Sequence, residues 1–325
     1  MNGSRTRVLL LIAILSALVA GPARAADTYP ARPVKLVVPF PPGGTSDIVA
    51  RVLANGMRDK LGQQIIIENR GGAGTLIGTE LVAKSPPDGY TLLWMTTPFA
   101  INASLHKKLP YDTFKDFIPV IDVISVPLMM IVHPSSPAKS VTDLVQMAKA
   151  APGKLSYGSS GSGGSPHLAM EMFKTMAGID INHIPYKGSA PSVMDLVAGQ
   201  TDVVIDTLFL TQQQVQAGKA RALAQTGTNR SKMVPDVPTM REMGLAGYEA
   251  TSWMSVAAPA GTPADAIGRL NAAANEVLQS AAVQELFAKQ GLEILGGTVQ
   301  DAARHLQNEV VRWGKAVKDS GAKAE

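Results

Sequence analysis

Short apolar runs alternate along the chain with segments whose apolar residues recur at helical spacing. From position 34 the runs "VKLVVPF" and "QIIIENR" are typical of strands, and between them apolar residues from Ile48 to Leu61 fall on one helical face. A helix after "GGAGT" and a strand at "TLLWMTT" continue the order. This alternation predicts an α/β fold, a mainly parallel sheet flanked by helices.

A second round of the same alternation begins at "VISVPLMMIV". Ser140 is expected to cap its first helix, with Asp143 three residues further on. The following strands and helices are predicted at "KLSYGSS", "HLAMEMFKTMAG", "IDINHIPY", "PSVMDLVAG" and "TDVVIDT". The second half thus has the layout of the first without its sequence.

The last part of the chain predicts two amphipathic helices separated by the short strand "LEILGG". Thr262 is expected to cap the first helix, with Pro263 at its first position. Thr298 and Asp301 mark the start of the second helix, which has apolar residues along one side. That apolar side needs a surface to pack on, most simply the first lobe.

These patterns together predict two lobes. The first domain is expected to be discontinuous, with residues 26–127 and 251–325, and the second to comprise residues 128–250. Two crossings between the lobes, near residues 125–132 and 247–255, would form a hinge around a cleft.

The N-terminal residues have the pattern of a cleaved secretory signal. Arg5 and Arg7 precede an apolar run, and a small-residue motif ends at Ala25, after which cleavage is expected. The run of about 13 apolar residues is shorter than the roughly 20 that a membrane-spanning helix needs. The chain contains no cysteine, which excludes a lipid-anchored exported form. We therefore expect the mature protein in the periplasm.

Charge argues against nucleic acid as a partner. Residues 1–25 contain three arginines and no acidic residue, so the formal net charge falls from +4 for the whole chain to +1 without them. No cluster of Lys or Arg is interleaved with aromatic residues, as a nucleic-acid surface requires.

The stretch "VPFPPGGTSD" leads from a predicted strand into a predicted helix. In open α/β sheets ligands bind at such strand ends, where helix N-termini offer unpaired N–H groups and attract anions. Gly43 and Gly44 allow close backbone approach, while Thr45 adds a hydroxyl. Asp47 is expected to pair with Arg51 one turn on. A tight turn with a helix cap and no ligand fits this stretch equally well.

A second Gly/Ser loop, "YGSSGSGGSP", favours the ligand interpretation. It also leads from a strand into a helix, with Ser165 as the expected cap and Pro166 at the first helical position. One anion-binding helix start in each lobe would form a clamp. A third loop, "NRGGAGTLIG", lacks the ending of a phosphate loop and is interpreted as helix-on-strand packing.

Catalytic and metal-binding patterns are scarce. The five histidines are scattered, and no cysteine, zinc motif or G-x-S-x-G elbow is present, so no metal and no cofactor is expected. His167 is interpreted as a packing residue. The aromatic residues Trp94, Phe99, Phe209 and Trp253 are assigned to the core or to an apolar wall of the cleft.

Several blocks together resemble one known family. They are "YPARPVKLVVPFPPGGTSDIVARVLA", "ENRGGAGTLIGTELVAKSPPDGYTLL", "YGSSGSGGSPHLAMEMF", "HIPYKGSAPSVMDLVAGQTDVVIDT" and "PDVPTMREMGLAGYEATSWMSVAAPAGTP". In this order they are similar to the Bug proteins, the TctC-family periplasmic receptors of tripartite tricarboxylate transporters. The resemblance implies a two-lobe Venus-flytrap fold of the periplasmic binding protein type, capture of a small carboxylate and delivery to a membrane permease. The protein is expected to be a monomer.

The resemblance also implies a set of binding residues, with carboxylate held by backbone amides, hydroxyls and water and not by an arginine. They are Phe40, Gly43, Gly44, Thr45, Ser46, Thr96, Thr97, Ser160, Gly161, Ser162, Gly164, Ser165 and Asp206. One departure is "TTPFAIN", where Phe99 is hypothesised to reshape the pocket. Asp206 fits a ligand contact and a turn cap equally well.

Two alternative functions remain open from the sequence. A sensor that engages a signalling partner would require the same closure of the lobes. An exported serine hydrolase would use a loop serine and needs a base within hydrogen-bond reach, for which His167 is the nearby candidate.

Overall fold

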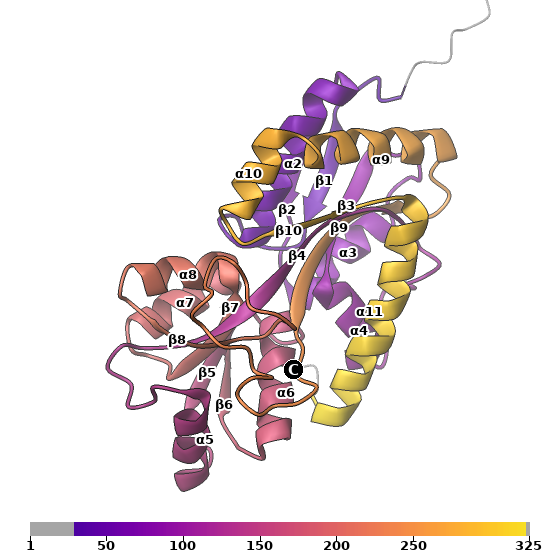
Figure 1. Ribbon diagram of the computed structural model, residues 1–325. Helices are drawn as coiled ribbons and strands as arrows, with labels where there is room; N and C mark the ends of the chain where they lie inside the picture. Colours follow the sequence, from indigo (N-terminus) through magenta and orange to yellow (C-terminus); the bar gives the residue numbers. More distant parts are fainter. Residues whose placement is uncertain (1–28, 323–325) are drawn as a thin grey trace, which may run out of the picture.

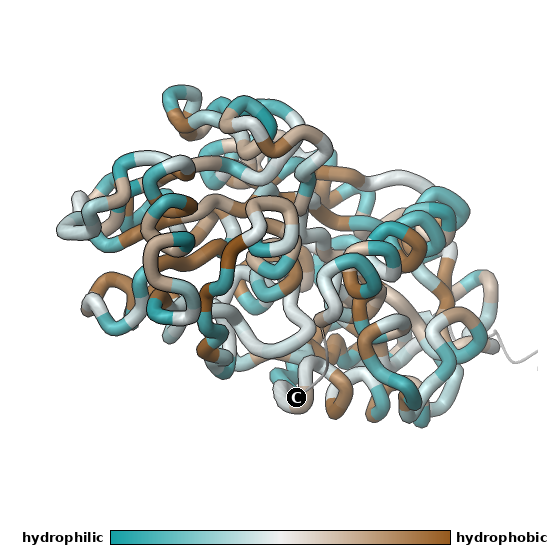
Figure 2. Tube along the Cα trace, turned by 90° about the horizontal axis from the view of Figure 1, so that it is seen from below, coloured by the Kyte–Doolittle hydropathy of each residue, from teal (hydrophilic) through white to brown (hydrophobic). Residues whose placement is uncertain are grey.

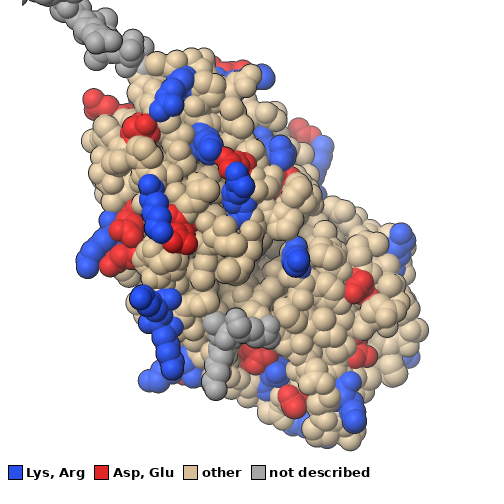
Figure 3. Space-filling view, turned by 180° about the vertical axis from the view of Figure 1, so that it is seen from behind, with Lys and Arg blue, Asp and Glu red and all other residues tan. Residues whose placement is uncertain are grey.

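The computed structural model describes residues 29–322, and the predicted signal peptide lies outside them. Two lobes of α/β structure are joined by long strands (Figure 1). In the view from behind, side chains of both charges are scattered over the surface, and the molecule is hollowed between the lobes (Figure 3). None of the helices in this part of the chain is long and apolar enough to cross a membrane.

The first lobe contains the N-terminal and C-terminal parts of the described chain. Its strands are β1 (Val34–Val38), β2 (Ile65–Asn69), β3 (Thr91–Thr96), the first part of β4 (Phe117–Val132), β9 (Thr251–Pro259) and β10 (Glu293–Gly296). Its helices are α2 (Thr45–Leu61), η1 (Ala73–Thr75), α3 (Leu76–Ala83), α4 (Thr97–Leu105), α9 (Ala264–Leu278), α10 (Ala281–Ala288) and α11 (Val299–Ser320). The strand order is β2-β1-β3-β9-β4-β10, and β9 and β10 run against the others.

The second lobe is formed by the middle of the chain around the end of β4. Its other strands are β5 (Ser156–Ser159), β6 (Asn182–Pro185), β7 (Val203–Thr207) and β8 (Arg221–Gln225). Its helices are α5 (Val141–Ala150), α6 (Ser165–Ala177), α7 (Ser189–Val197) and α8 (Leu208–Gln216). β7 and β8 flank β4, and β5 and β6 continue the sheet in parallel beyond β7. In both lobes most strands share one direction, as the α/β pattern predicts.

Strand β4 connects the lobes and divides the apolar core into two layers. Side chains alternate across a strand, so Leu128 and Met130 belong to one hydrophobic cluster, and Met129 and Ile131 to the other. Each cluster continues from one lobe into the other, so neither lobe has a core of its own. Figure 2 shows hydrophobic stretches running through the interior, with hydrophilic ones on the outer helices.

Of the predicted caps at Ser140, Thr298 and Thr262, two are present in the structure. The Ser140 hydroxyl accepts the Asp143 N–H, and Thr298 forms a reciprocal capping box with Asp301, so both predicted caps are confirmed. The predicted cap at Thr262 is wrong. Its hydroxyl donates to the Pro259 carbonyl at 2.7 Å, and Pro263 occupies the cap position of α9.

The last helix covers both lobes. Helix α11 packs on α4 and β4 in the first lobe and on α6 in the second, and Figure 1 shows it running from one lobe to the other. The prediction that it packs on the first lobe is therefore incomplete. Because β4 passes unbroken through residue 127, the domain boundaries given above stay a prediction.

Candidate functional site

The first-lobe loop ahead of α2 is held in place from behind by Asp47. The carboxylate of Asp47 accepts the Gly43 N–H at 3.1 Å and the Asn69 amide at 3.0 Å, and it lies 2.9 Å from Arg51. Burial opposes ionisation, but the hydrogen bonds from Arg51 and Gly43 outweigh it, and the pKa of Asp47 is lowered. The predicted pairing with Arg51 is confirmed, and the carboxylate is engaged away from the cleft.

The loop ahead of α6 is built for a close approach between the lobes. Gly163 has a φ of +79°, and a Cβ there would lie 2.7 Å from the side chain of Leu105 in α4. Gly164 occupies the cap position and Ser165 is the first helical residue, so the predicted cap at Ser165 is wrong by one position. Without a capping side chain, the first turn of α6 keeps its N–H groups available.

Among residues 29–322, five helices begin at the cleft, and no side chain of this range caps any of them. Their cap positions are Gly44 for α2, Thr96 for α4, Gly164 for α6, Gly188 for α7 and Thr207 for α8. Each N-terminus carries a partial positive charge and unpaired N–H groups. Their convergence on one space creates a site that favours an anion.

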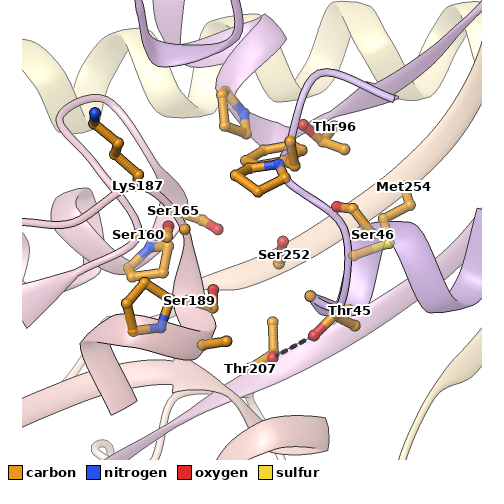
Figure 4. A pocket seen from close by; sticks show the side chains of 18 of the residues that line it. Thr45, Ser46, Thr96, Ser160, Ser165, Lys187, Ser189, Thr207, Ser252 and Met254 are labelled. Atoms are coloured by element: carbon orange, nitrogen blue, oxygen red, sulfur yellow. Dashed lines mark hydrogen bonds between the residues drawn. The ribbon is translucent and has the colours of Figure 1, made fainter. Parts of the chain in front are cut away.

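The space between these helix starts is a small cavity of about 70 Å³. Figure 4 shows hydroxyl side chains from both lobes around it, with Thr45 and Ser46 on one side and Ser165 and Ser189 on the other. The remaining hydroxyl residues of the lining are Thr96, Ser160, Thr207 and Ser252. This volume is below the roughly 300 Å³ at which ligand pockets begin, so a whole ligand would need further space beside the cavity.

The lobes touch each other in this structure. The hydroxyls of Thr45 in α2 and Thr207 in β7 lie 3.0 Å apart and are buried (Figure 4). A Cβ on Gly74 of the first lobe would lie 3.1 Å from the Ser162 carbonyl of the second. The arrangement is that of a closed clamp, with contacts that opening would break.

Most of the predicted binding residues line this cavity or an adjoining one. The first cavity is lined by Phe40, Gly44, Thr45, Ser46, Thr96, Ser160 and Ser165. The adjoining cavity is lined by Phe40, Ser160, Gly161, Ser162 and Gly164. Their contact with a ligand stays a proposal.

Three predicted residues line neither cavity. The Gly43 N–H is taken by Asp47. The Thr97 hydroxyl accepts the Trp253 N–H at 2.9 Å behind the cleft. Asp206 is fully buried and accepts the Thr207 N–H at 2.7 Å, so it stabilises the turn into α8.

Asp206 is nevertheless close to the site. Burial raises the pKa of Asp206 to about 6, although hydrogen bonds from Thr207 and Ser189, which both line the cavity, oppose the rise. Its second oxygen, Oδ2, is buried and has no hydrogen-bond partner within the described part of the chain. The group is therefore costly to ionise in the folded protein.

The adjoining cavity contains residues that the sequence interpretation missed. Its volume is about 460 Å³, and residues 71–75 of the third Gly-rich loop form one wall. The packing interpretation holds for Gly78 of the same loop, where a Cβ would lie 2.7 Å from the Arg70 carbonyl. The "YKGSA" segment was also missed, and it supplies Lys187 and Ser189.

The predicted pocket role of Phe99 is wrong. Phe99 is buried, stacked on Tyr111 with ring centroids 5.5 Å apart and edge-on to Phe117 at 5.1 Å. Trp94 and Trp253 are also buried and line neither cavity, as their assignment to the core requires. Phe40 is the aromatic residue that the cavities share.

The serine–histidine contact next to the loop before α6, between Ser159 and His183 at 2.7 Å, lies outside the lining of both cavities. His167 is buried, its Nδ1 accepts the Gly163 N–H at 3.2 Å, and its ring stacks on His183. It does not line the cavity that Ser165 lines. Within the same residues no group of His, Cys, Asp and Glu side chains could hold a metal ion.

Comparisons with known proteins agree on one family. The model of the tripartite tricarboxylate transporter family receptor matches residues 49–322. Protein BugT of Bordetella pertussis is 41% identical over 325 residues, which cover 99% of each chain.

Solved structures with ligands have the same fold. A protein of R. palustris with adipate is 40% identical, with a TM-score of 0.87 over 91% of this chain and 99% of its own. MatC from Rhodopseudomonas palustris, with bound malate, is 31% identical, with a TM-score of 0.85 over 89% of this chain and 100% of its own. The two-lobe binding-protein architecture predicted from the sequence is thereby confirmed.

Proposed function

Because this chain belongs to the tripartite tricarboxylate transporter receptor family, we propose that it captures a small carboxylate in the cleft between its lobes and delivers it to a membrane permease. The family is one of solute-binding receptors, not of enzymes. For this chain, both the carboxylate ligand and the permease partner are proposed.

The convergence of five uncapped helix N-termini on the cavity carries this proposal. A carboxylate there would accept N–H groups from α2, α6 and α7 and hydroxyl groups such as those of Ser46 and Ser165. Such donors hold an anion without a buried cation. Two similar proteins were solved with adipate and malate, both carboxylates, which supports the same ligand class here.

Closure of the lobes would show a membrane partner that the receptor has bound its ligand. The ligand can favour the closed form only through contacts that it makes better there, and the hydroxyl lining comes from both lobes. A permease that recognises the closed form would then bind the receptor together with its ligand. A signalling partner would recognise the same form, and the permease is preferred on family membership.

One experiment tests location and ligand together. The chain is expressed with its own N-terminus and recovered from the periplasm, where the mass is expected to match residues 26–325. The thermal midpoint is then followed with adipate, malate and their methyl esters. A ligand at a hundred times its dissociation constant adds about 2.7 kcal/mol of stability.

The free acids are expected to raise the midpoint and the uncharged esters to leave it unchanged. If neither these acids nor other small mono-, di- and tricarboxylates stabilise protein refolded free of ligand, the proposed function is wrong. A mass that includes residues 1–25 would contradict the signal peptide alone.

A further inference from the structure

The loop at residues 72–75, in the wall of the adjoining cavity, has an unusual backbone. All four of its residues have a positive φ, including the non-glycine residues Ala73 at +47° and Thr75 at +82°. A positive φ strains any residue that carries a side chain, and most of all a β-branched residue such as threonine. A backbone of this kind persists only where its surroundings hold it in place.

The side chain of Asn102 holds this loop. Asn102 lies in α4 and is fully buried. Its amide group donates to the Gly74 carbonyl at 3.0 Å and to the Thr75 hydroxyl oxygen at 3.4 Å. The Thr75 carbonyl also accepts the hydroxyl of Thr79, which belongs to the helix that follows the loop. Asn102 therefore ties the strained residues to an element that is distant in the sequence.

The second lobe meets the first at the same place. A Cβ on Gly163 would lie 3.3 Å from Oδ1 of Asn102 and 2.7 Å from the side chain of Leu105. A Cβ on Gly74 would lie 3.1 Å from the Ser162 carbonyl. The loop before α6 thus approaches both Asn102 and the segment that Asn102 holds. A shift of the loop at residues 72–75 would change the surface on which the second lobe closes.

We propose that Asn102 is a positioning residue for closure, because it holds the loop at residues 72–75 in the strained conformation that the second lobe meets. The inference rests on the proposed function and adds a residue that acts on binding although it lines neither cavity. Without the Asn102 amide the loop is expected to relax. The affinity then falls with the fraction of molecules in which the loop keeps its place.

The test measures the effect of Asn102→Ala in three backgrounds, by calorimetric titration with the acid that stabilises wild type most. In the wild-type background Asn102→Ala is expected to weaken binding about tenfold. In the Thr75→Gly background the loss is expected to be about twofold or less, because glycine adopts a positive φ without strain. Thr75→Ala also removes the hydroxyl but keeps the strain, so the loss there is expected to stay near tenfold.

This comparison within each background cancels any direct effect of Thr75 on the ligand. A matched control for lost stability is Asn271→Ala. The Asn271 amide also donates to two backbone carbonyls, those of Val120 at 2.8 Å and Gly297 at 3.0 Å, away from both cavities. Asn271→Ala is expected to lower the thermal midpoint and to bind as wild type does.

Hydrogen exchange gives a second readout, at the Thr75 N–H that donates to the Gly72 carbonyl. Without ligand, its exchange is expected to be about tenfold faster in Asn102→Ala than in wild type and unchanged in Asn271→Ala. If Asn102→Ala does not fold, Asn102→Ser replaces it, since serine keeps a polar group but is too short to reach the Gly74 carbonyl.

The inference is overturned if the folded Asn102 variant binds as wild type does, or if its loss of affinity is equal in the Thr75→Gly and Thr75→Ala backgrounds. Unchanged exchange at the Thr75 amide would also overturn it. Failure of every acid to bind wild type would instead overturn the proposed function.

Discussion

At the scale of single residues, two buried aspartates beside the cleft have opposite roles. Asp47 is ionised and held by Arg51 and by the Gly43 N–H, so it fixes the loop that presents the first turn of α2. Within the residues that the structure describes, Asp206 has no cationic partner, and one of its oxygens makes no hydrogen bond. The pairing of Asp47 could be predicted because Arg51 is four residues away. The environment of Asp206 could not, because it depends on how α7 packs.

The raised pKa of Asp206 predicts a pH-dependent loss of stability. Its folded-state pKa of about 6 lies above its usual value of 3.8, so the folded protein binds more protons than the unfolded chain between these values. The stabilisation by the protonated Asp206 carboxyl group is complete below pH 4 and is lost as the pH rises through 6. One pKa unit corresponds to about 1.4 kcal/mol, so the loss is roughly 3 kcal/mol.

Denaturant unfolding of wild type and Asp206→Asn at pH 4 and pH 7 measures this effect. The stability of Asp206→Asn relative to wild type is expected to rise by about 3 kcal/mol between these pH values. Asp59→Asn, at an exposed carboxylate, is expected to show no such rise. A difference that is the same at both pH values would mean that Asp206 titrates as an exposed carboxylate.

At the scale of elements, the site consists of helix starts, and their exact positions decide which residues line it. The Gly-rich loops before α2 and α6 were predictable because a strand, a flexible loop and an amphipathic helix follow in order. Helix α7 was expected from Pro191 but begins at Ser189, which brings "KGSA" to the cleft. Helix α4 was missed because nearly all of its residues are buried, so it has no polar face.

From the glycine loop before α6 we predict that the variant Gly163→Ala folds but that its two lobes close less readily than those of wild type. In Gly163→Ala the new Cβ would meet Leu105 across the cleft at 2.7 Å, in addition to the strain of a positive φ. Gly218 has a similar φ of +68° with open space around it, so Gly218→Ala is the matched control. Each alanine in the left-handed region costs about 1–2 kcal/mol of stability.

Calorimetric titration uses the acid that stabilises wild type most. It separates the effect of the Leu105 contact on closure from the effect of backbone strain on stability. Gly163→Ala is expected to weaken binding about tenfold, because closure becomes less favourable by about 1.4 kcal/mol. Gly218→Ala is expected to bind as wild type does. Equal affinities for all three proteins would show that the approach of this loop to α4 does not limit closure.

At the scale of the whole molecule, the two-lobe architecture and two crossings near residues 125–132 and 247–255 could be predicted, but the unbroken strand that joins the lobes could not. Alternating strands and helices define both lobes, and the return of the chain at β9 follows from the apolar side of the last helix. The unbroken passage of β4 and the contacts of α11 with both lobes depend on pairings between distant segments. The position of residues 71–75 at the cleft also depends on contacts between distant segments, so their sequence alone indicates packing.

The central claim is that helix N-terminal amides of both lobes hold a carboxylate. The most direct measurement is a titration of ¹⁵N-labelled protein with the stabilising acid, followed by the amide resonances of the backbone. The account predicts that the largest shifts occur at Thr45, Ser46, Ser165 and Ser189, and that the methyl ester produces none of them. Saturable binding that leaves these four amides unchanged while shifting others would contradict it.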